Sequence, residues 1–259
     1  MTWTTRPRSK RGPLAAITAG DGPAILLIHG VGLRAEAWAA QIDALAENHS
    51  VTAVDLPGHG LSAPIRQASG LADFTHTVAT CLDQPSVVVG HSFGAMIALD
   101  LAIRHPGKVA GVAPLNAIYR RDAAARSAVL ARANSLDGVR VADPTPPLDR
   151  WFGPDASPER DACRDWLLSV DQAGYKAAYT VFATEAGPQD AALASLTCPA
   201  LFMTGGREPN STPQMSRDMA ALTPRGRAMI VADAAHMMPM THPDVVTAAL
   251  GTFGQACHL

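Results

Sequence analysis

The sequence is poor in cysteine and has almost no net charge. Its four cysteines include no CxxC pair and no thiol beside a histidine at metal-ligand spacing, so we expect free thiols in a reducing cytoplasm. Lys and Arg total 21 against 23 Asp and Glu, a net charge of −2. Without a basic excess, neither a nucleic acid nor an anionic membrane is an expected partner. We also expect no metal and no cofactor.

Long apolar segments are missing as well. No stretch approaches the ~20 residues that a membrane-spanning helix needs. Basic residues near the N-terminus precede an apolar run at residues 14–17, but this run is too short for a secretory signal and is soon followed by Gly20 and Asp21. A transit peptide stays open as an alternative for this segment.

Apolar residues make up 47% of the chain and charged residues 17%, enough to build a sizeable core. Short, largely apolar runs without alternation are typical of strands covered on both faces. Six such runs occupy residues 24–28, 51–54, 86–89, 109–113, 200–203 and 228–231. Helical patterns at residues 36–47, 73–82 and 95–103 lie between them. Alternating strands and helices predict an α/β fold with a doubly wound, mostly parallel sheet.

One region interrupts this alternation. Residues 119–193 contain no good candidate for a buried strand. Helical patterns cover residues 122–136, 161–170 and 172–184, and the composition of residues 143–147 indicates a loop. We therefore predict a helical cap (residues 119–193) inserted between late strands of a core formed by residues 1–118 and 194–259. The cap is large enough to cover an active site.

The strongest local signal is Gly90-His91-Ser92-Phe93-Gly94, which matches the G-x-S-x-G nucleophile elbow. In this motif a serine at a sharp strand-to-helix turn exposes its Oγ, and only small residues fit two positions before and after it. A chance match in an ordinary turn is the alternative. The strand candidate before the motif and the helical pattern after it favour Ser92 as a nucleophile.

A serine hydroxyl needs a general base within hydrogen-bond reach. Among nine histidines, His236 follows the last strand candidate and precedes the C-terminal helical segment, which is where the chain order Ser, acid, His puts the base. His242 is followed by Pro243 and is better explained as a cap of the final helix. We predict that His236 is the base.

The base in turn needs a carboxylate that fixes its tautomer. Glu208 is the only carboxylate in the loop at residues 204–210, after the fifth apolar run, and is assigned this role. Two alternatives stay open. Glu208 could be a surface residue paired with Arg207, and Asp233 could orient His236 from three residues away.

Acyl transfer also needs donors for an oxyanion. One expected donor is the backbone N–H of Phe93, directly after the nucleophile. The other is the N–H of Val31, in the glycine-rich loop that follows the first apolar run.

Four segments together resemble the α/β-hydrolase superfamily in order and spacing, over nearly the whole chain: residues 29–32, 55–62, 90–94 and 235–236. The resemblance implies a serine hydrolase of that fold. One departure concerns the acid, because the family pattern Gly-x-x-Asp-Pro is here Gly205-Gly206-Arg207-Glu208-Pro209. Glutamate is longer by a methylene, so the loop must be arranged slightly differently.

Within the superfamily, the cap resembles that of 3-oxoadipate enol-lactonases, at Asp149-Arg150-Trp151-Phe152 and at Gly174-Tyr175. This resemblance implies a small acidic substrate. Arg34 and Arg150 are then candidates for binding its carboxylate, although both could be surface arginines. Trp151 and Met237 are further candidate substrate contacts, although helix packing explains the methionine equally well.

The leading hypothesis is a serine hydrolase that cleaves a small carboxylic ester or lactone through an acyl-enzyme. Hydrolysis of a carbon–carbon or amide bond in a small acidic ring-cleavage product would use the same residues. A third hypothesis is a small-molecule-binding signalling protein of the same fold. The sequence does not determine the oligomeric state.

Overall fold

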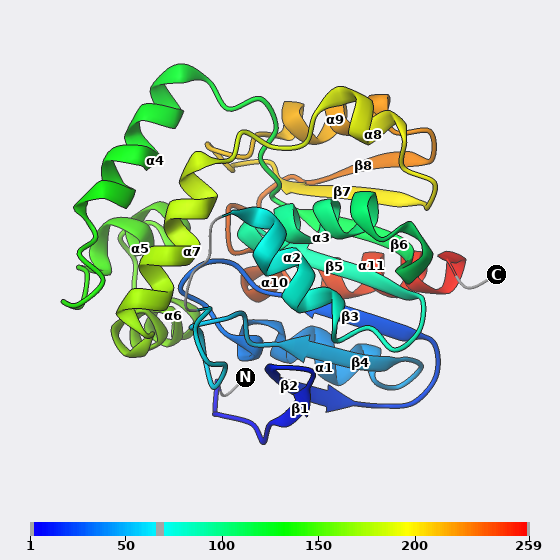
Figure 1. Cartoon of the computed structure of the whole chain (residues 1–259), viewed down its shortest axis with the longest axis horizontal. Helices are drawn as coiled ribbons and strands as arrows, with labels where there is room; N and C mark the ends of the chain where they lie inside the picture. Colours follow the sequence, from blue (N-terminus) through cyan, green and yellow to red (C-terminus); the bar gives the residue numbers. More distant parts are fainter. Residues whose placement is uncertain (1–2, 66–69, 258–259) are drawn as a thin grey trace.

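An eight-stranded sheet runs through the protein, flanked by helices on both faces (Figure 1). The computed structural model describes residues 3–65 and 70–257. The strand order is β1-β2-β4-β3-β5-β6-β7-β8, in which β2 pairs antiparallel with β1 and β4 and the other pairs are parallel. The strands are β1 (Ser9–Arg11), β2 (Leu14–Ala19), β3 (Ala24–Ile28), β4 (Ser50–Val54), β5 (Ser86–His91), β6 (Val109–Leu115), β7 (Ala200–Gly205) and β8 (Gly226–Val231). The predicted α/β fold with a mostly parallel sheet is confirmed.

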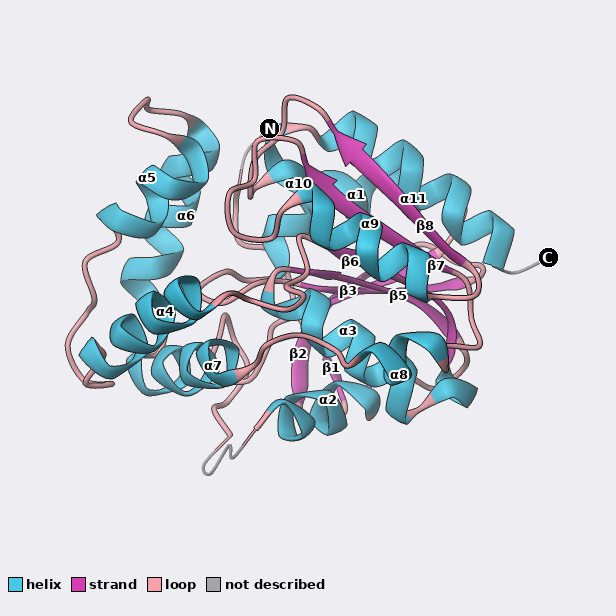
Figure 2. Ribbon diagram, turned by 90° about the horizontal axis from the view of Figure 1, so that it is seen from above, coloured by secondary structure: helices cyan, strands magenta, loops and turns pink. Residues whose placement is uncertain are grey.

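Alternate side chains of the central strands enter two separate cores. Leu26 and Val88 face one core, and Leu27 faces the other. The first core is covered by α2 (Leu71–Ala79), α3 (Phe93–Arg104), α8 (Asp190–Ala194) and α9 (Pro213–Leu222). The second is covered by η1 (Ala35–Trp38), α1 (Ala39–Leu45), α10 (Met238–Thr241) and α11 (Pro243–Cys257). Figure 2 shows α2, α3 and α8 on one side of the sheet and α1 and α11 on the other. This double cover explains why the strands are apolar throughout.

Two segments near the edges of the sheet bear on the sequence-based expectations. The apolar run at residues 14–17, which is too short for a secretory signal, lies in β2 next to one edge, where Ala16 pairs with Val54 of β4. At the other edge, β8 was expected to be buried, but its residues are mostly exposed or half-buried. That expectation is wrong because β8 is the outermost strand, where flanking elements cover less of the sheet.

Between β6 and β7 the chain forms α4 (Ala123–Ser135), α5 (Thr145–Phe152), α6 (Pro158–Ser169) and α7 (Gln172–Thr184), followed by α8. In Figure 1, α4 to α7 gather beside one end of the sheet. The predicted loop at residues 143–147 is wrong in its second half, because α5 already begins at Thr145. Proline lacks an N–H but fits the first turn of a helix, so Pro146 and Pro147 begin this helix instead of preventing it.

A buried ionic cluster ties the N-terminal segment to the core. The Arg8 guanidinium donates to Glu36 Oε2 at 2.6 Å and to Asp55 Oδ2 at 2.8 Å. The Arg8 side chain is 5% exposed, and those of Glu36 and Asp55 are 1% and 0% exposed. Asp55 also accepts from the backbone N–H groups of Ala35 and Leu61. The locally basic N-terminus is therefore partly engaged in ion pairs inside the protein.

Replacing Arg8 by methionine leaves Glu36 and Asp55 as buried charges without this partner. We expect the free energy of unfolding to fall by about 3–5 kcal/mol, measured by urea denaturation at neutral pH. The control is Arg11→Met, which breaks the exposed Arg11–Asp83 pair and should cost less than ~1 kcal/mol. Equal losses in the two variants would contradict the buried-cluster interpretation.

The same cluster predicts a pH dependence of stability. Burial alone would raise the pKa of Glu36, but hydrogen bonds from Arg8, Arg6 and Arg34 outweigh burial and lower it from 4.5 to about 2. A lowered pKa means that the carboxylate stabilises the fold above pH 4.5 and that this stabilisation is lost as the pH falls toward 2. In Arg8→Met, Glu36 loses one of the partners that lower its pKa, so the loss in free energy of unfolding between pH 4.5 and about 2 should be smaller than in the wild type.

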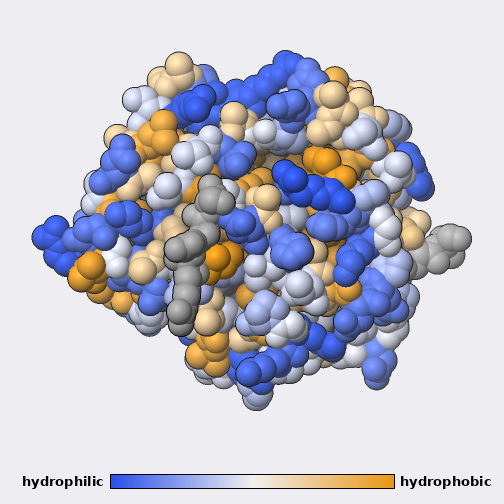
Figure 3. All heavy atoms as spheres, viewed as in Figure 1, coloured by the Kyte–Doolittle hydropathy of each residue, from blue (hydrophilic) through white to orange (hydrophobic). Residues whose placement is uncertain are grey.

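The sequence also led to expectations about disulfides, metal ions and membrane spans. All four cysteines are free thiols. Within residues 3–65 and 70–257, no three His, Cys, Asp or Glu side chains are grouped so that they could hold a metal ion. No helix in those two ranges has the length and apolar character needed to cross a membrane. The face seen in Figure 3 mixes hydrophobic and hydrophilic residues.

Candidate active site

Ser92 occupies a strained turn between β5 and α3. Its backbone has φ 57° and ψ −115°, a conformation that non-glycine residues rarely adopt. The turn requires glycine on both sides. A Cβ on Gly90 would lie 2.0 Å from the carbonyl oxygen of Gly94, and a Cβ on Gly94 would lie 2.2 Å from that of Ile28. The turn therefore has the backbone geometry and the close packing expected of a nucleophile elbow.

His236 is held by Glu208 on the loop after β7. The Nδ1 atom of His236 lies 2.7 Å from Glu208 Oε2, and the Glu208 side chain is fully buried. Burial alone would raise the pKa of Glu208, but the charge and hydrogen bond of His236 and the N–H groups of Asn210 and Ser211 lower it to about 2. An ionised carboxylate only accepts, so Nδ1 carries a proton, and the neutral form of the imidazole then has its lone pair on Nε2. This tautomer suits His236 to accept a proton.

The two alternatives for Glu208 differ from the observed pairing. Arg207 pairs with Asp233 at 3.0 Å, and both side chains are largely exposed. Glu208 points inward to His236. The structure thus pairs His236 with Glu208, as the sequence indicated, and not with Asp233, which is nearer along the chain.

The backbone of His236 is fixed by two further side chains. Its carbonyl oxygen accepts from His91 Nε2 at 2.8 Å and from Asn116 Nδ2 at 2.6 Å. Asn116 follows β6, has φ 52°, and accepts from the N–H of Gly205 with its Oδ1 atom. Burial and the nearby charge of His236 lower the pKa of His91 to about 3, so His91 is a neutral donor here. The sequence-based prediction missed Asn116, although its position after a strand candidate was a usable signal, since parallel strands end at one edge.

The two expected oxyanion donors belong to the residue after Ser92 and to the loop after β3. Phe93 is the first residue of α3, and the first N–H groups of a helix have no acceptor within it. Val31 follows β3 and lines the cavity described next. Its loop is anchored by His29, whose Nε2 accepts from the N–H of Leu56 at 2.9 Å.

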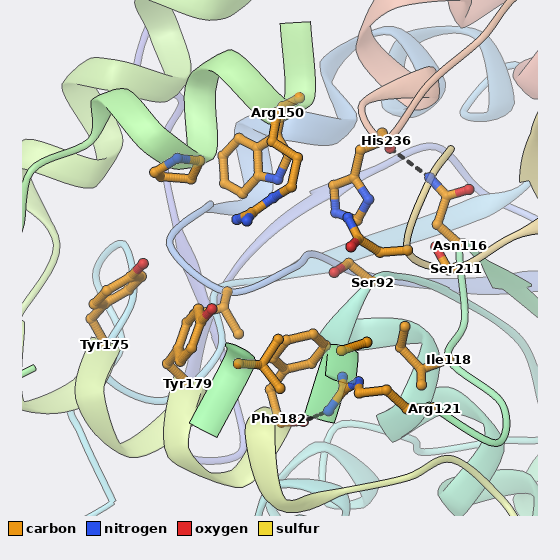
Figure 4. Close-up of a pocket in the computed structure, with 16 residues that line it drawn as sticks. Ser92, Asn116, Ile118, Arg121, Arg150, Tyr175, Tyr179, Phe182, Ser211 and His236 are labelled. Carbon is orange, nitrogen blue, oxygen red and sulfur yellow. Dashed lines mark hydrogen bonds between the residues drawn. The ribbon is translucent and has the colours of Figure 1, made fainter. Parts of the chain in front are cut away.

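A cavity joins Ser92 and His236 to the helices at residues 119–193. Figure 4 shows these two residues on one side of the cavity and Tyr175 and Tyr179 across it. Trp151 stacks on the His236 ring, with centroids 5.8 Å apart and planes at 15°. The lining consists of Val31, Ser92, Asn116, Ile118, Arg121, Ala125, Val129, Pro147, Arg150, Trp151, Tyr175, Tyr179, Phe182, Asn210, Ser211 and His236. A mostly apolar cavity with a few polar groups suits a small organic ligand.

Comparison with known proteins agrees with this geometry. A family model described as the alpha/beta hydrolase family matches residues 25–249. The chain belongs to the alpha/beta hydrolase family. It is 35% identical to an (E)-2-((N-methylformamido)methylene)succinate hydrolase of Acinetobacter baylyi, over 89% of this chain and 90% of that protein. It is 28% identical to a pimeloyl-[acyl-carrier protein] methyl ester esterase of Edwardsiella ictaluri, over 91% and 95% of the two chains.

Among solved structures, the enol-lactonase of Burkholderia xenovorans superimposes with a TM-score of 0.82. The identity is 22%, over 95% of this chain and 99% of that one, so this likeness concerns the fold alone. Together with the named relatives, the family assignment makes this protein an enzyme, a hydrolase of the alpha/beta hydrolase kind.

Of the four predicted substrate contacts of this alpha/beta hydrolase, two line the cavity and two do not. Arg150 and Trp151, on α5, line the cavity. Arg34 does not line it, because its guanidinium turns to Glu36, with Nε 2.8 Å from Oε2. Met237 is 1% exposed, packs in the core beneath the helices of residues 119–193, and does not line the cavity either. Arg121, Tyr179 and Phe182 also line the cavity from residues 119–193, and none of the three was singled out from the sequence.

Proposed function

We propose that this enzyme cleaves a small carboxylic ester or lactone through an acyl-enzyme formed on Ser92. The supporting observation is the 2.7 Å hydrogen bond between the buried Glu208 side chain and His236, beside the cavity that Ser92 lines at its strained turn. Such an arrangement orients the imidazole and leaves Nε2 to accept the serine proton.

In the proposed reaction, Ser92 Oγ attacks the substrate carbonyl while its proton passes to His236 Nε2. The N–H groups of Val31 and Phe93 stabilise the oxyanion. When the bond to the leaving oxygen breaks, that oxygen takes the proton from His236, and the acyl group stays on Ser92. A water then loses a proton to His236 and attacks the acyl carbon, which releases the acid and returns the proton to Ser92.

We also propose that residues 119–193 act as a cap over this site, with residues 1–118 and 194–259 as the core. Trp151 stacks on His236, and α4, α5 and α7 contribute most of the apolar lining. Excluding water from this side of the site would strengthen the hydrogen bonds to the oxyanion.

The test is a panel of small aryl esters, enol-lactones, anilides and vinylogous diketones, assayed with purified enzyme. We expect multiple turnovers on esters or lactones, with the fastest rates on acyl groups small enough for the cavity. A single slow turnover with tight product retention would instead support a ligand-binding protein of this fold.

Amide hydrolysis is the second candidate, favoured by one comparison. The relative that is 35% identical is named for a substrate with an N-methylformamido group. The same residues would serve, with His236 protonating a leaving nitrogen in place of oxygen. Faster turnover of an N-formyl or N-acyl enamine than of the matched ester would select this candidate over the first.

The pairing of Glu208 with His236 predicts unequal effects of two isosteric changes. Glu208→Gln should lower kcat by about 10²–10⁴-fold, because an amide can donate to Nδ1 and favour the wrong tautomer. Asp233→Asn, which alters an exposed pair with Arg207, should leave kcat nearly unchanged. Steady-state kinetics on one ester compares the two. Greater damage from Asp233→Asn would show that the acid is assigned to the wrong residue.

A further inference from the structure

Arg121 lies at the edge of the cavity, just before α4, and only part of its guanidinium is used by the protein. Its Nη1 atom donates to the carbonyl oxygens of Phe182, Ala183 and Glu185, at 3.3, 3.2 and 3.1 Å, where α7 ends. The guanidinium carbon lies 4.6 Å from the centroid of the Phe182 ring. These contacts hold the side chain in place beside the cavity (Figure 4).

The other terminal nitrogen of Arg121 has no partner among residues 3–65 and 70–257. Nη2 is a buried donor without a hydrogen bond among the residues that the structure describes. Burial lowers the pKa of Arg121 below its usual value, and the neighbouring groups that act on it are the Tyr179 phenol and the Arg126 guanidinium, not a carboxylate. A buried cationic donor without a partner costs free energy, and a ligand that accepts from it recovers that cost.

The rest of the cavity matches an anionic ligand. No Asp or Glu is among its lining residues, whereas Arg150, which makes no ion pair within the described parts of the chain, lines its exposed side. Burial raises the pKa of Tyr175 and of Tyr179, so both phenols stay neutral and can donate hydrogen bonds. Ser211 Oγ is a second buried lining atom for which the described part of the chain offers no hydrogen-bond partner.

We propose that Arg121 Nη2 binds a free carboxylate of the substrate, so that the preferred substrates are half-esters, lactones or amides of small dicarboxylic acids. This inference rests on the proposed function and adds the charge of its substrate. A carboxylate fits better than a phosphate, because one available NH2 group in a largely apolar lining compensates a single negative charge and not two. The carboxylate lies on the part of the substrate that extends from the scissile carbonyl toward Phe182 and α7.

Matched aryl esters test this inference on the wild-type enzyme. The pairs are the 4-nitrophenyl half-esters of glutaric, adipic and pimelic acid and the same compounds with the free carboxyl methylated, each corrected for its rate in buffer. We expect kcat/KM to be about 10- to 100-fold higher for the acidic member of at least one pair, mainly through a lower KM, and the preference to shrink with added salt. Equal or lower kcat/KM for all acidic members overturns the inference.

Two variants separate a binding role from a structural one. Arg121→Met should lower the acidic-to-neutral ratio of kcat/KM by about 10- to 100-fold. Arg126→Met removes a nearby exposed charge that does not line the cavity and should leave that ratio unchanged. An equal loss on both members of each pair would mean that Arg121 only supports α7, and would overturn the inference. If Arg121→Met does not fold, the wild-type comparison still decides.

The outcomes also distinguish this inference from the proposed function. Turnover of the neutral esters that disappears in Ser92→Ala, without any preference for the acidic esters, would refute the carboxylate site alone. No Ser92-dependent turnover of either member of any pair would refute the proposed function.

Discussion

Replacing Ser92 by alanine is expected to lower kcat by about 10⁴-fold or more while the protein stays folded. The change removes only the hydroxyl, and the remaining oxyanion donors and binding contacts give little acceleration by themselves. The measurements are kcat on a 4-nitrophenyl ester and the mass increase after treatment with a fluorophosphonate, which should disappear with the hydroxyl.

Ser92→Gly provides the matched control for stability. Because Ser92 has φ 57°, glycine should relieve backbone strain, so this variant should be inactive and yet have a higher Tm than the wild type. Such a result would separate lost chemistry from lost structure. Activity near the wild-type level in Ser92→Ala would show that the nucleophile is another residue.

Replacing His236 by alanine should reduce kcat by a similar factor, about 10⁴-fold or more, and should slow the labelling of Ser92. Without the imidazole, no group accepts the proton of Ser92 Oγ during attack. The variant also leaves Glu208 buried with fewer partners, so the free energy of unfolding should fall by about 1–3 kcal/mol, which a Tm measurement can detect.

His242 provides the control for this second prediction. It is the nearest competing histidine along the chain, and its Nδ1 atom lies 2.9 Å from the hydroxyl of Thr241, away from Glu208. His242→Ala should keep kcat within about two-fold of the wild type. If His242→Ala were the more damaging variant, the base would be misassigned.

Much of the fold was predictable because its signals are local. Runs such as residues 24–28 are apolar at every position, which happens when both faces of a strand are covered, and β3 is covered in this way. The apolar run at residues 228–231 wrongly predicted that β8 is buried, since a sequence does not state which strand lies at the edge of the sheet. The sequence-based prediction also failed at Thr145, where prolines typical of a loop instead form the first turn of α5.

The candidate site was also predictable only in part from the sequence. Ser92 was indicated by five consecutive residues, and His236 by its place after the last strand, because strand order fixes which loops meet at the active edge. Arg34 was expected at the cavity from its position next to the glycine-rich loop, but Glu36, two residues on, holds its guanidinium. Arg121 and Asn116 escaped notice because their partners lie more than 60 residues away along the chain.

The sequence by itself determined the turn at Ser92, the alternation of strands and helices, and the family, because these depend on steric and apolar patterns within a few consecutive residues. The tertiary structure alone decided that Glu208 and not Asp233 meets His236, and that Arg121 has an unused donor beside the cavity. Directions of long polar side chains depend on which charges and carbonyls converge from distant segments, and a linear sequence does not contain those distances.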